Sequence, residues 1–327
     1  MVLDTTPRLE YLPGMEMRAD GIKGLTPAQM WDADSAKHSL DELFNNARRY
    51  RSGGSYRVFM EFVSRFRFYS PYNAMLLHVQ MPGAQFVAPA IRWLSLYDRD
   101  IKASARPLVI LQPMGPVMFV FDVSDTEPRP KARPLPKAVD NPFEGLSGHV
   151  GPAYYERTIE NAKRDGVKIT TCKEGSQSAG SIMVQDSKTS EKIPFLIAKN
   201  KTGEDIFTLL LVRYHLLVNE KISREARYAT IVHELAHLYC GHIGTPNVKW
   251  WPNRIGLASN VSEFEAESVA YLICKRLGIQ IPSDSYLSGY LLKNDQDIPP
   301  ISLERVLKAA GLIETMGLNR MKLRKEK

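Results

Sequence analysis

The segment Ile231-Val-His-Glu-Leu-Ala-His-Leu238 constrains the fold of this 327-residue chain more than any other feature. His233 and His237 are four residues apart, so a helix places both imidazoles on the same face. The apolar residues of the segment fall on a separate stripe: Ile231, Leu235 and Leu238. A helix with one apolar stripe is typical of a helix that packs on a core. The pattern therefore predicts a helix over about residues 224–239 with its apolar stripe buried.

The His-Glu-x-x-His pattern within this segment offers ligands for a single metal ion. Imidazole nitrogens one helical turn apart can bind one Zn²⁺ ion, and Glu234 then lies beside the vacant coordination position. A zinc ion in an enzyme has three protein ligands and one position open to water. The candidates for the third ligand are His242, Glu263, Glu265 and Glu267. The sequence therefore predicts a zinc site whose third ligand comes from this set.

Glu263 and Glu267 are again four residues apart, in a helix predicted over about residues 261–276. The arrangement is similar to that of the zincin metallopeptidases, in which the first acid binds zinc and the second holds a ligand histidine. The resemblance implies Glu263 as the third ligand and Glu267 as the histidine partner. Glu265 lies two residues from each, so we expect a solvated acid there. The other interpretation of all three is an acidic helix start that complements the helix dipole.

His242 follows Gly241 just beyond the predicted end of the first helix. A histidine at this place can bond to the free carbonyl groups of the helix or interact with its dipole. We expect His242 to have this role and not to bind the metal.

These residues are typical of metal-dependent hydrolysis. A bound zinc ion lowers the pKa of water towards neutrality and polarises a carbonyl group. Glu234 would take the proton from that water and deliver it to the leaving amine. A further donor is expected for the oxyanion, and the candidates near in sequence are Tyr239, Trp250, Trp251 and Arg254. The sequence does not choose among them.

Composition is that of an ordinary globular protein, with 44% hydrophobic and 24% charged residues. No apolar run approaches the roughly 18–20 residues that a membrane span needs. The first residues show no basic flank before an apolar core, which argues against a secretory signal. The cysteines are odd in number and far apart, which favours a reducing cytosol: Cys172, Cys240 and Cys274. We therefore expect a cytoplasmic protein with no membrane segment.

The chain divides into two parts of different pattern. Helical patterns run from about residue 34 to residue 80, and apolar runs near residues 107–112 and 117–122 predict a β-hairpin. Five prolines lie between Thr126 and Pro142, so we interpret residues 126–150 as a linker. Strands are expected near residues 181–184, 193–198 and 207–218. The prediction is an α+β protein with a helical module at residues 1–125 and a zincin-like domain at residues 151–327.

Two stretches of the second half resemble the ImmA/IrrE family of bacterial metallopeptidases, and especially the C-terminal domain of ArdC-type antirestriction proteins. They are Arg227-Tyr-Ala-Thr-Ile-Val-His-Glu-Leu-Ala-His-Leu238 and Glu263-Phe-Glu-Ala-Glu-Ser-Val-Ala270. Three stretches of the first half resemble the N-terminal domain of the same proteins: Tyr69-Ser-Pro-Tyr-Asn-Ala74, Gln80-Met-Pro-Gly-Ala84 and Arg92-Trp93. That domain is associated with single-stranded DNA binding. The resemblance covers about residues 40–125 and 205–280. It implies a zinc peptidase in a mobile-element or stress-response setting.

The first half also carries a pattern that fits nucleic acid without reference to a family. Within twenty positions only Glu61 opposes a set of arginines: Arg48, Arg49, Arg51, Arg57, Arg65 and Arg67. Aromatic residues are interspersed: Tyr50, Tyr56, Phe66, Tyr69 and Tyr72. Arginines neutralise phosphates and rings stack on unpaired bases. The resulting candidate contacts to single-stranded DNA are Arg49, Arg51, Arg57, Tyr72 and Asn73. The alternative is that the rings form core and the arginines cover a helix face.

One departure from the family weakens the nucleic-acid interpretation. The family carries a Gly/Lys-rich turn before the hairpin, whereas this chain has Ile101-Lys-Ala-Ser-Ala-Arg106. This departure puts a nucleic-acid contact from that turn in doubt. The formal net charge of +7 fits a nucleic-acid partner, although it would equally favour other acidic surfaces.

The sequence as a whole predicts a zinc-dependent endopeptidase that acts on a protein target and is coupled to DNA binding. A DNA-bound regulator or a defence protein is the expected target. The alternative is an antirestriction or single-stranded DNA-binding protein in which zinc is structural and proteolysis is not required. A third interpretation, a protein-interaction scaffold, predicts no bound metal.

Overall fold

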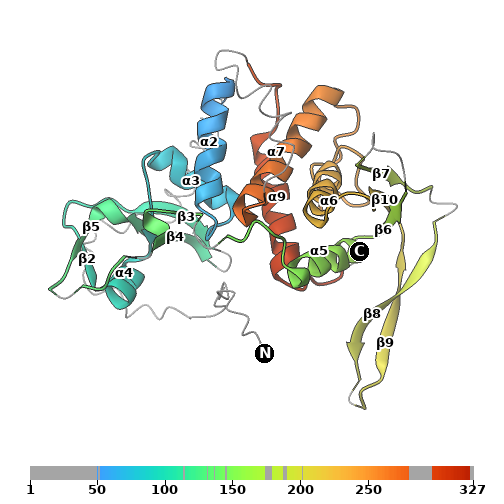
Figure 1. The fold of residues 1–327 in the computed structure, drawn as a ribbon, viewed down its shortest axis with the longest axis horizontal. Helices are drawn as coiled ribbons and strands as arrows, with labels where there is room; N and C mark the ends of the chain where they lie inside the picture. The colour runs from blue at the N-terminus through green and yellow to red at the C-terminus, as the bar shows by residue number, and fades with distance from the viewer. Residues whose placement is uncertain are drawn as a thin grey trace.

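Helices α6 (Arg224–Tyr239) and α7 (Ser259–Leu277) lie against each other at the centre of the protein (Figure 1). Helix α9 (Leu303–Leu318) packs on α7 and on α5 (Pro152–Arg164). The computed structural model describes residues 50, 52–112, 115–130, 132–135, 137–143, 146–173, 179–186, 190–200, 202–279 and 297–324. Its mixture of helices and small, mostly antiparallel sheets confirms the predicted α+β class.

Helix α6 has the range that the sequence predicted. Ser223 caps its start by accepting a hydrogen bond from the Ala226 N–H at 3.2 Å. The predicted apolar stripe is buried. The helix ends before Gly241, which has φ of 86°, and a Cβ there would lie 2.2 Å from the carbonyl oxygen of Pro252. Only glycine fits at this position, so the chain after the helix can pack closely against its end.

A three-stranded sheet lies beside α6 in the order β6 (Val167–Cys172), β10 (Tyr214–Asn219), β7 (Gly180–Val184). Strand β10 is parallel to β6 and antiparallel to β7. Gly180 allows β7 to lie close to α6, since a Cβ at this residue would be only 2.6 Å from Cγ2 of Thr230. Among the described residues β7 pairs with β10 alone. It is therefore an edge strand that runs beside the helix that carries the histidines.

Strands β8 (Lys192–Lys199) and β9 (Asp205–Leu211) form a separate hairpin that projects from the body of the protein (Figure 1). The sequence predicted a single strand over residues 207–218, and this prediction is wrong. The strand is interrupted after Leu211, where the Val212 N–H bonds to Glu191 and the Arg213 N–H bonds to Gly166. The run contains no turn residue, so nothing in the sequence marks the point where the chain leaves one sheet for another.

The described part of the first half contains helices α2 (Gly53–Arg65) and α3 (Pro71–Gln80), which pack together. Ser70 caps α3 and Pro71 occupies its first turn. Gly53 and Gly54 begin α2, whose start is capped by the side chain of Ser52. The predicted hairpin is formed by β3 (Leu108–Gln112) and β4 (Gly115–Asp122), and β1 (Val87–Ala88) extends it.

A smaller set of elements surrounds Trp93, which is fully buried. Helix α4 (Ala90–Tyr97), which the sequence did not predict, carries this residue, and its indole N–H donates to the carbonyl of Phe121 at 2.9 Å. Strands β2 (Arg99–Ile101) and β5 (Thr126–Pro128) form a two-stranded sheet. The 3-10 helices η4 (Val123–Asp125) and η5 (Lys137–Val139) lie beside it in the sequence. Part of the segment predicted as a linker is therefore structured.

One hydrophobic core contains residues from both sides of that segment. Tyr56 on α2 is fully buried and donates its hydroxyl proton to Ser268 on α7 at 2.8 Å. Arg276, near the end of α7, donates to the carbonyls of Val63 at 2.7 Å and Tyr69 at 2.6 Å. These bonds satisfy carbonyl groups at and after the end of α2 that the helix itself leaves unpaired. The described parts of residues 1–125 and 151–327 therefore share one core.

Some predicted features fall outside the described residues. The helix expected from residue 34 and the arginines Arg48, Arg49 and Arg51 lie there. Within the described ranges, no helix combines the length and the apolar composition that crossing a membrane requires.

Candidate metal centre

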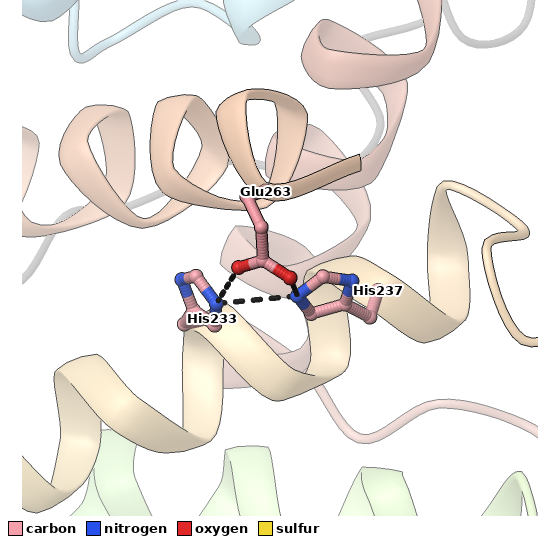
Figure 2. A group of neighbouring side chains, drawn as sticks. All are labelled: His233, His237 and Glu263. Atoms are coloured by element: carbon pink, nitrogen blue, oxygen red, sulfur yellow. Dashed lines mark hydrogen bonds and ion pairs between the residues drawn. The ribbon is translucent and has the colours of Figure 1, made fainter. Parts of the chain in front are cut away.

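Three side chains from α6 and α7 meet where the two helices pack together. The Nε2 atoms of His233 and His237 are 3.2 Å apart. One carboxylate oxygen of Glu263 lies 3.5 Å from the Nε2 atom of His233, and the other lies 3.5 Å from that of His237. Figure 2 shows the carboxylate of Glu263 reaching from α7 towards both rings. The structure thus brings together the three residues that were predicted as metal ligands.

The spacing of these donor atoms fits a tetrahedral metal ion. Zinc bonds of about 2.0–2.1 Å at tetrahedral angles hold ligand atoms about 3.3–3.4 Å apart. The nitrogen–nitrogen distance of 3.2 Å and the nitrogen–oxygen distances of 3.5 Å lie on either side of that value. Two imidazoles and a carboxylate are also a donor set that suits zinc, whereas calcium and magnesium prefer oxygen ligands. The cluster of His233, His237 and Glu263 could therefore hold a zinc ion.

Glu267 contacts His233 on the side of the ring that faces away from the cluster. Its carboxylate oxygen lies 3.0 Å from the Nδ1 atom of His233. An ionised carboxylate can only accept a hydrogen bond, so Nδ1 carries a proton, and in the neutral imidazole Nε2 then directs its lone pair into the cluster. Glu267 thus lies where the sequence placed a histidine partner, one helical turn after Glu263.

Charge couples the members of this cluster. Burial opposes protonation of His233, but hydrogen bonds with Glu263 and Glu267 outweigh it and raise the pKa of His233 to about 10. Hydrogen bonds from His233 and His237 hold the pKa of Glu263 well below its usual range. The cluster therefore attracts a cation, either a proton or a metal ion. Because the two compete for the same nitrogen, metal binding is expected to release a proton.

Glu234 follows His233 on α6 and is half-buried. Its carboxylate accepts a hydrogen bond from the backbone N–H of Ile182 on the edge strand β7. Burial raises the pKa of Glu234, which brings it closer to the range of an effective general base. The sequence predicted the role of Glu234 but gave no sign of its contact with Ile182, which depends on how β7 packs beside α6.

His242 and Glu265 lie in a different environment from the one that the sequence predicted. His242 was expected to bond to helix carbonyls, but its Nδ1 atom lies 3.0 Å from Nδ1 of His237. Glu265 was expected to be a solvated acid, and this prediction is wrong because the residue is fully buried. Its carboxylate lies 2.9 Å from Nε2 of His242 and 2.6 and 2.8 Å from two nitrogens of Arg254. A buried acid requires such a partner, and no pattern near Glu265 indicated that Arg254 would supply it.

Most of the candidate oxyanion donors have other partners. Tyr239 donates to Asp165 at 3.0 Å, and the indole N–H of Trp251 donates to the carbonyl of Gly244 at 2.9 Å. Arg254 is held by Glu265, as described above. Of the four candidates, Trp250 is half-buried and forms ring contacts with Trp251 and with arginine side chains.

The predicted DNA contacts belong to the first half of the sequence. Asn73 has structural partners, because its side chain donates to the Leu111 carbonyl and accepts from the Leu111 N–H, each at 3.0 Å. Tyr56 and Phe66 are buried in the core, as the alternative interpretation expected. Arg57 and Tyr72 are half-buried, and their contact with DNA stays a prediction. The other two candidates, Arg49 and Arg51, lie outside the described residues.

Comparisons with known proteins add little to this geometry. No family model matches the sequence, and no curated protein matches it significantly. Among solved structures, the metal-free crystal structure of the antirestriction protein ArdC from plasmid R388 is similar over 77% of this chain and 86% of that chain. The two sequences are 14% identical and the TM-score is 0.33. A similarity at this level does not assign a function, so the site is interpreted from its own residues.

Proposed function

We propose that this protein is a zinc-dependent peptidase in which Glu234 is the general base. The observation that carries the proposal is the cluster of His233, His237 and Glu263, whose donor atoms lie within 4.8 Å of one another, with Glu234 next to His233 on α6. The ligands of the zinc ion would be His233, His237 and Glu263, with Glu267 holding His233.

The exposure of the cluster favours a catalytic metal over a structural one. Structural zinc sites are closed by four protein ligands, whereas catalytic sites have three and keep one position open. The described residues offer three donors here, and the side chain of Glu263 is 44% exposed. A small molecule or a peptide could therefore reach the metal position from the solvent.

The reaction assigned to this site is hydrolysis of an amide bond. A bound zinc ion would supply Lewis-acid chemistry, which activates water and polarises the substrate carbonyl. Glu234 takes the proton from the attacking water and transfers it to the leaving nitrogen as the carbon–nitrogen bond breaks. The N–H of Ile182 would help to hold this carboxylate in place.

The edge strand β7 favours a peptide as the substrate. An extended peptide can add to an exposed strand through main-chain hydrogen bonds. Strand β7 pairs with β10 on one side, and Ile182 of β7 directs its N–H to Glu234. A peptide that pairs with β7 on the side away from β10 would therefore pass the general base and the metal position.

Peptide cleavage by the full-length, zinc-loaded protein tests this proposal. Incubation with a degenerate peptide library, followed by mass spectrometry, should reveal cleavage by the unaltered protein. The variant Glu234→Gln should keep its zinc and lose about 10²-fold or more of the activity, since a general base contributes at least that much. The variant Glu225→Gln is the matched control, because Glu225 lies on the same helix but bonds to His149 at 3.0 Å. Undiminished cleavage by Glu234→Gln would contradict the proposal.

The alternative function is protection of single-stranded DNA, the kind of antirestriction role that the sequence resemblance implied. In that case the metal would be structural, the zinc-loaded protein would cleave no peptide, and Glu234→Gln would bind DNA normally. Among the described candidates, Arg57→Gln should reduce the salt dependence of DNA binding, and Tyr72→Ala should lower affinity without changing that dependence. DNA binding without peptide cleavage would select this alternative.

A further inference from the structure

A chain of buried polar groups extends from His237 into the interior. The Nδ1 atom of His237 lies 3.0 Å from Nδ1 of His242, whose Nε2 atom lies 2.9 Å from a carboxylate oxygen of Glu265. Two guanidinium nitrogens of Arg254 hold the two oxygens of Glu265 at 2.6 and 2.8 Å. The side chain of His242 is 4% exposed and that of Glu265 is fully buried, so water has little access to these bonds. Helix α6, helix α7 and the segment between them therefore meet in one chain of contacts that ends at His237.

The direction of each hydrogen bond in this chain follows from Arg254, which lies at the end away from His237. Arg254 can only donate, and the backbone N–H of Ser302 also donates to Glu265 at 2.6 Å. Glu265 is therefore an ionised acceptor, and Nε2 of His242 must donate to it. A neutral imidazole carries one N–H, so Nδ1 of His242 accepts the bond from His237. It follows that His237 carries its proton on Nδ1 and presents the lone pair of Nε2 to the cluster.

We propose that Arg254, Glu265 and His242 form a positioning relay, which holds His237 in the tautomer and orientation needed to bind the metal. None of the three binds the metal itself. The proposal rests on the proposed zinc site and adds to it the reason why His237 is a competent ligand. Glu267 has the same effect on His233 through one direct contact of 3.0 Å. The two ligand histidines would therefore be held by different means.

The same residues could be interpreted as a second metal site. Donor atoms of Cys240, His242 and Glu265 lie within 4.8 Å of one another. However, Glu265 is already held by Arg254 and Ser302, and a cation placed there would lie beside the guanidinium charge. The sulfur of Cys240 lies 3.8 Å from the carbonyl oxygen of Arg305, as expected for a weakly donating thiol. The geometry therefore favours a relay without a metal of its own.

Zinc affinity, measured by chelator competition with the full-length protein, is the first test. The variant His242→Phe keeps a ring but removes the acceptor of His237, and it should weaken zinc binding by about 10–100-fold. The variant His242→Asn should restore much of the affinity, because its side-chain oxygen can take the place of Nδ1. Glu267→Ala, which removes the partner of His233, should weaken binding to a similar extent. Cys240→Ala is the control, and it should leave both the affinity and the stoichiometry of one zinc per chain unchanged.

A different result is expected if His242 has only a structural role. The variant His242→Phe would then have a lower melting temperature in the metal-free form, and the zinc affinity of its folded molecules would be unchanged. That outcome would overturn the relay. A loss of bound zinc in Cys240→Ala, from two ions to one, would also overturn it in favour of a second metal site.

The tautomers themselves can be observed in the unaltered protein. The chain has 7 histidines, so imidazole ¹⁵N NMR spectra of the zinc-bound form are simple enough to assign. The relay predicts a proton on Nδ1 of His237 and on Nε2 of His242, and the opposite tautomer of His242 would contradict it even if the variants fail to fold. These measurements do not depend on cleavage. Zinc binding with the predicted tautomers but no peptide hydrolysis would contradict the proposed peptidase alone, whereas an inability to bind zinc would overturn both proposals.

Discussion

Two neighbouring faces of α7 carry residues at the same four-residue spacing, but one face contacts the metal-site histidines and the other packs in the core. Glu263 and Glu267, four residues apart, face α6 and contact its histidines. Phe264 and Ser268, also four residues apart, face α2 and contact the buried ring and hydroxyl of Tyr56. A shift of one residue along a helix rotates the side chain by about 100°. That rotation separates a polar cluster from an apolar core.

The two faces also differ in their access to water. The side chain of Glu263 is 44% exposed and that of Glu267 is 11% exposed, whereas Phe264 and Ser268 are fully buried. A ligand needs an open position, and a core residue needs complete contact with its neighbours. The difference implies that substitutions on the first face change metal binding, while substitutions on the second face change stability.

The largest effect is expected on the open face of α7, which carries Glu263 and Glu267. Replacement of Glu263 by alanine should leave the purified protein without bound zinc, because two histidines alone make a weak site. The fold of the metal-free protein should be retained, since the removed side chain is half-exposed and supports no core packing. Metal analysis together with circular dichroism measures both quantities.

Full zinc occupancy in Glu263→Ala would move the third ligand to another acid. Glu267 would be the acid to examine next, since Glu265 is held by Arg254 and Ser302. The zinc content of Glu263→Ala therefore shows whether Glu263 is the third ligand.

The next effect concerns Phe264, on the closed face of α7 that contacts α2. Phe264→Ala should lower the free energy of unfolding of the metal-free protein by about 3–5 kcal/mol, because it removes a fully buried ring and leaves a cavity. The ring of Phe264 lies 5.4 Å from that of Tyr56, so contacts between α7 and α2 are lost as well. Denaturant titration measures the change, and the zinc affinity of the molecules that remain folded should not alter. A reduced affinity would show that the two faces are coupled.

The sequence predicted one of these faces better than the other. The four-residue spacing was sufficient to place His233 and His237 on one face, because helical geometry determines which residues share a face. Glu263, on the other helix, was chosen from the resemblance to zincins, and the structure brings it to both histidines. The contact between α2 and α7 was not predicted, since it joins Tyr56 to Ser268 across 212 residues. Local patterns carry no information about such distant partners.

The same limit explains the error at Glu265. Its position on α7 was predicted correctly, but its partner Arg254 comes from an irregular segment after α6. The break between β9 and β10 was missed for a related reason, because partners in other segments determine where that run leaves the hairpin. Helix ranges, by contrast, depend mainly on neighbours in the sequence, and the range predicted for α6 matches the structure.

The smallest effect tests the hydroxyl pair that joins α2 to the closed face. Tyr56→Phe removes the donor of a buried 2.8 Å bond to Ser268 and should lower the free energy of unfolding by about 0.5–1.5 kcal/mol. Ser268→Ala removes a second bond as well, since its hydroxyl also donates to the Phe264 carbonyl at 2.7 Å. A double-mutant cycle in denaturant therefore isolates the Tyr56–Ser268 contribution. Zinc affinity should be the same in all four proteins, because Ser268 faces away from the metal cluster although it directly follows Glu267 in the sequence. A coupling energy of zero would remove the hydroxyl pair as a link between the halves, and the ring contact with Phe264 would then be the one that holds α2 on α7.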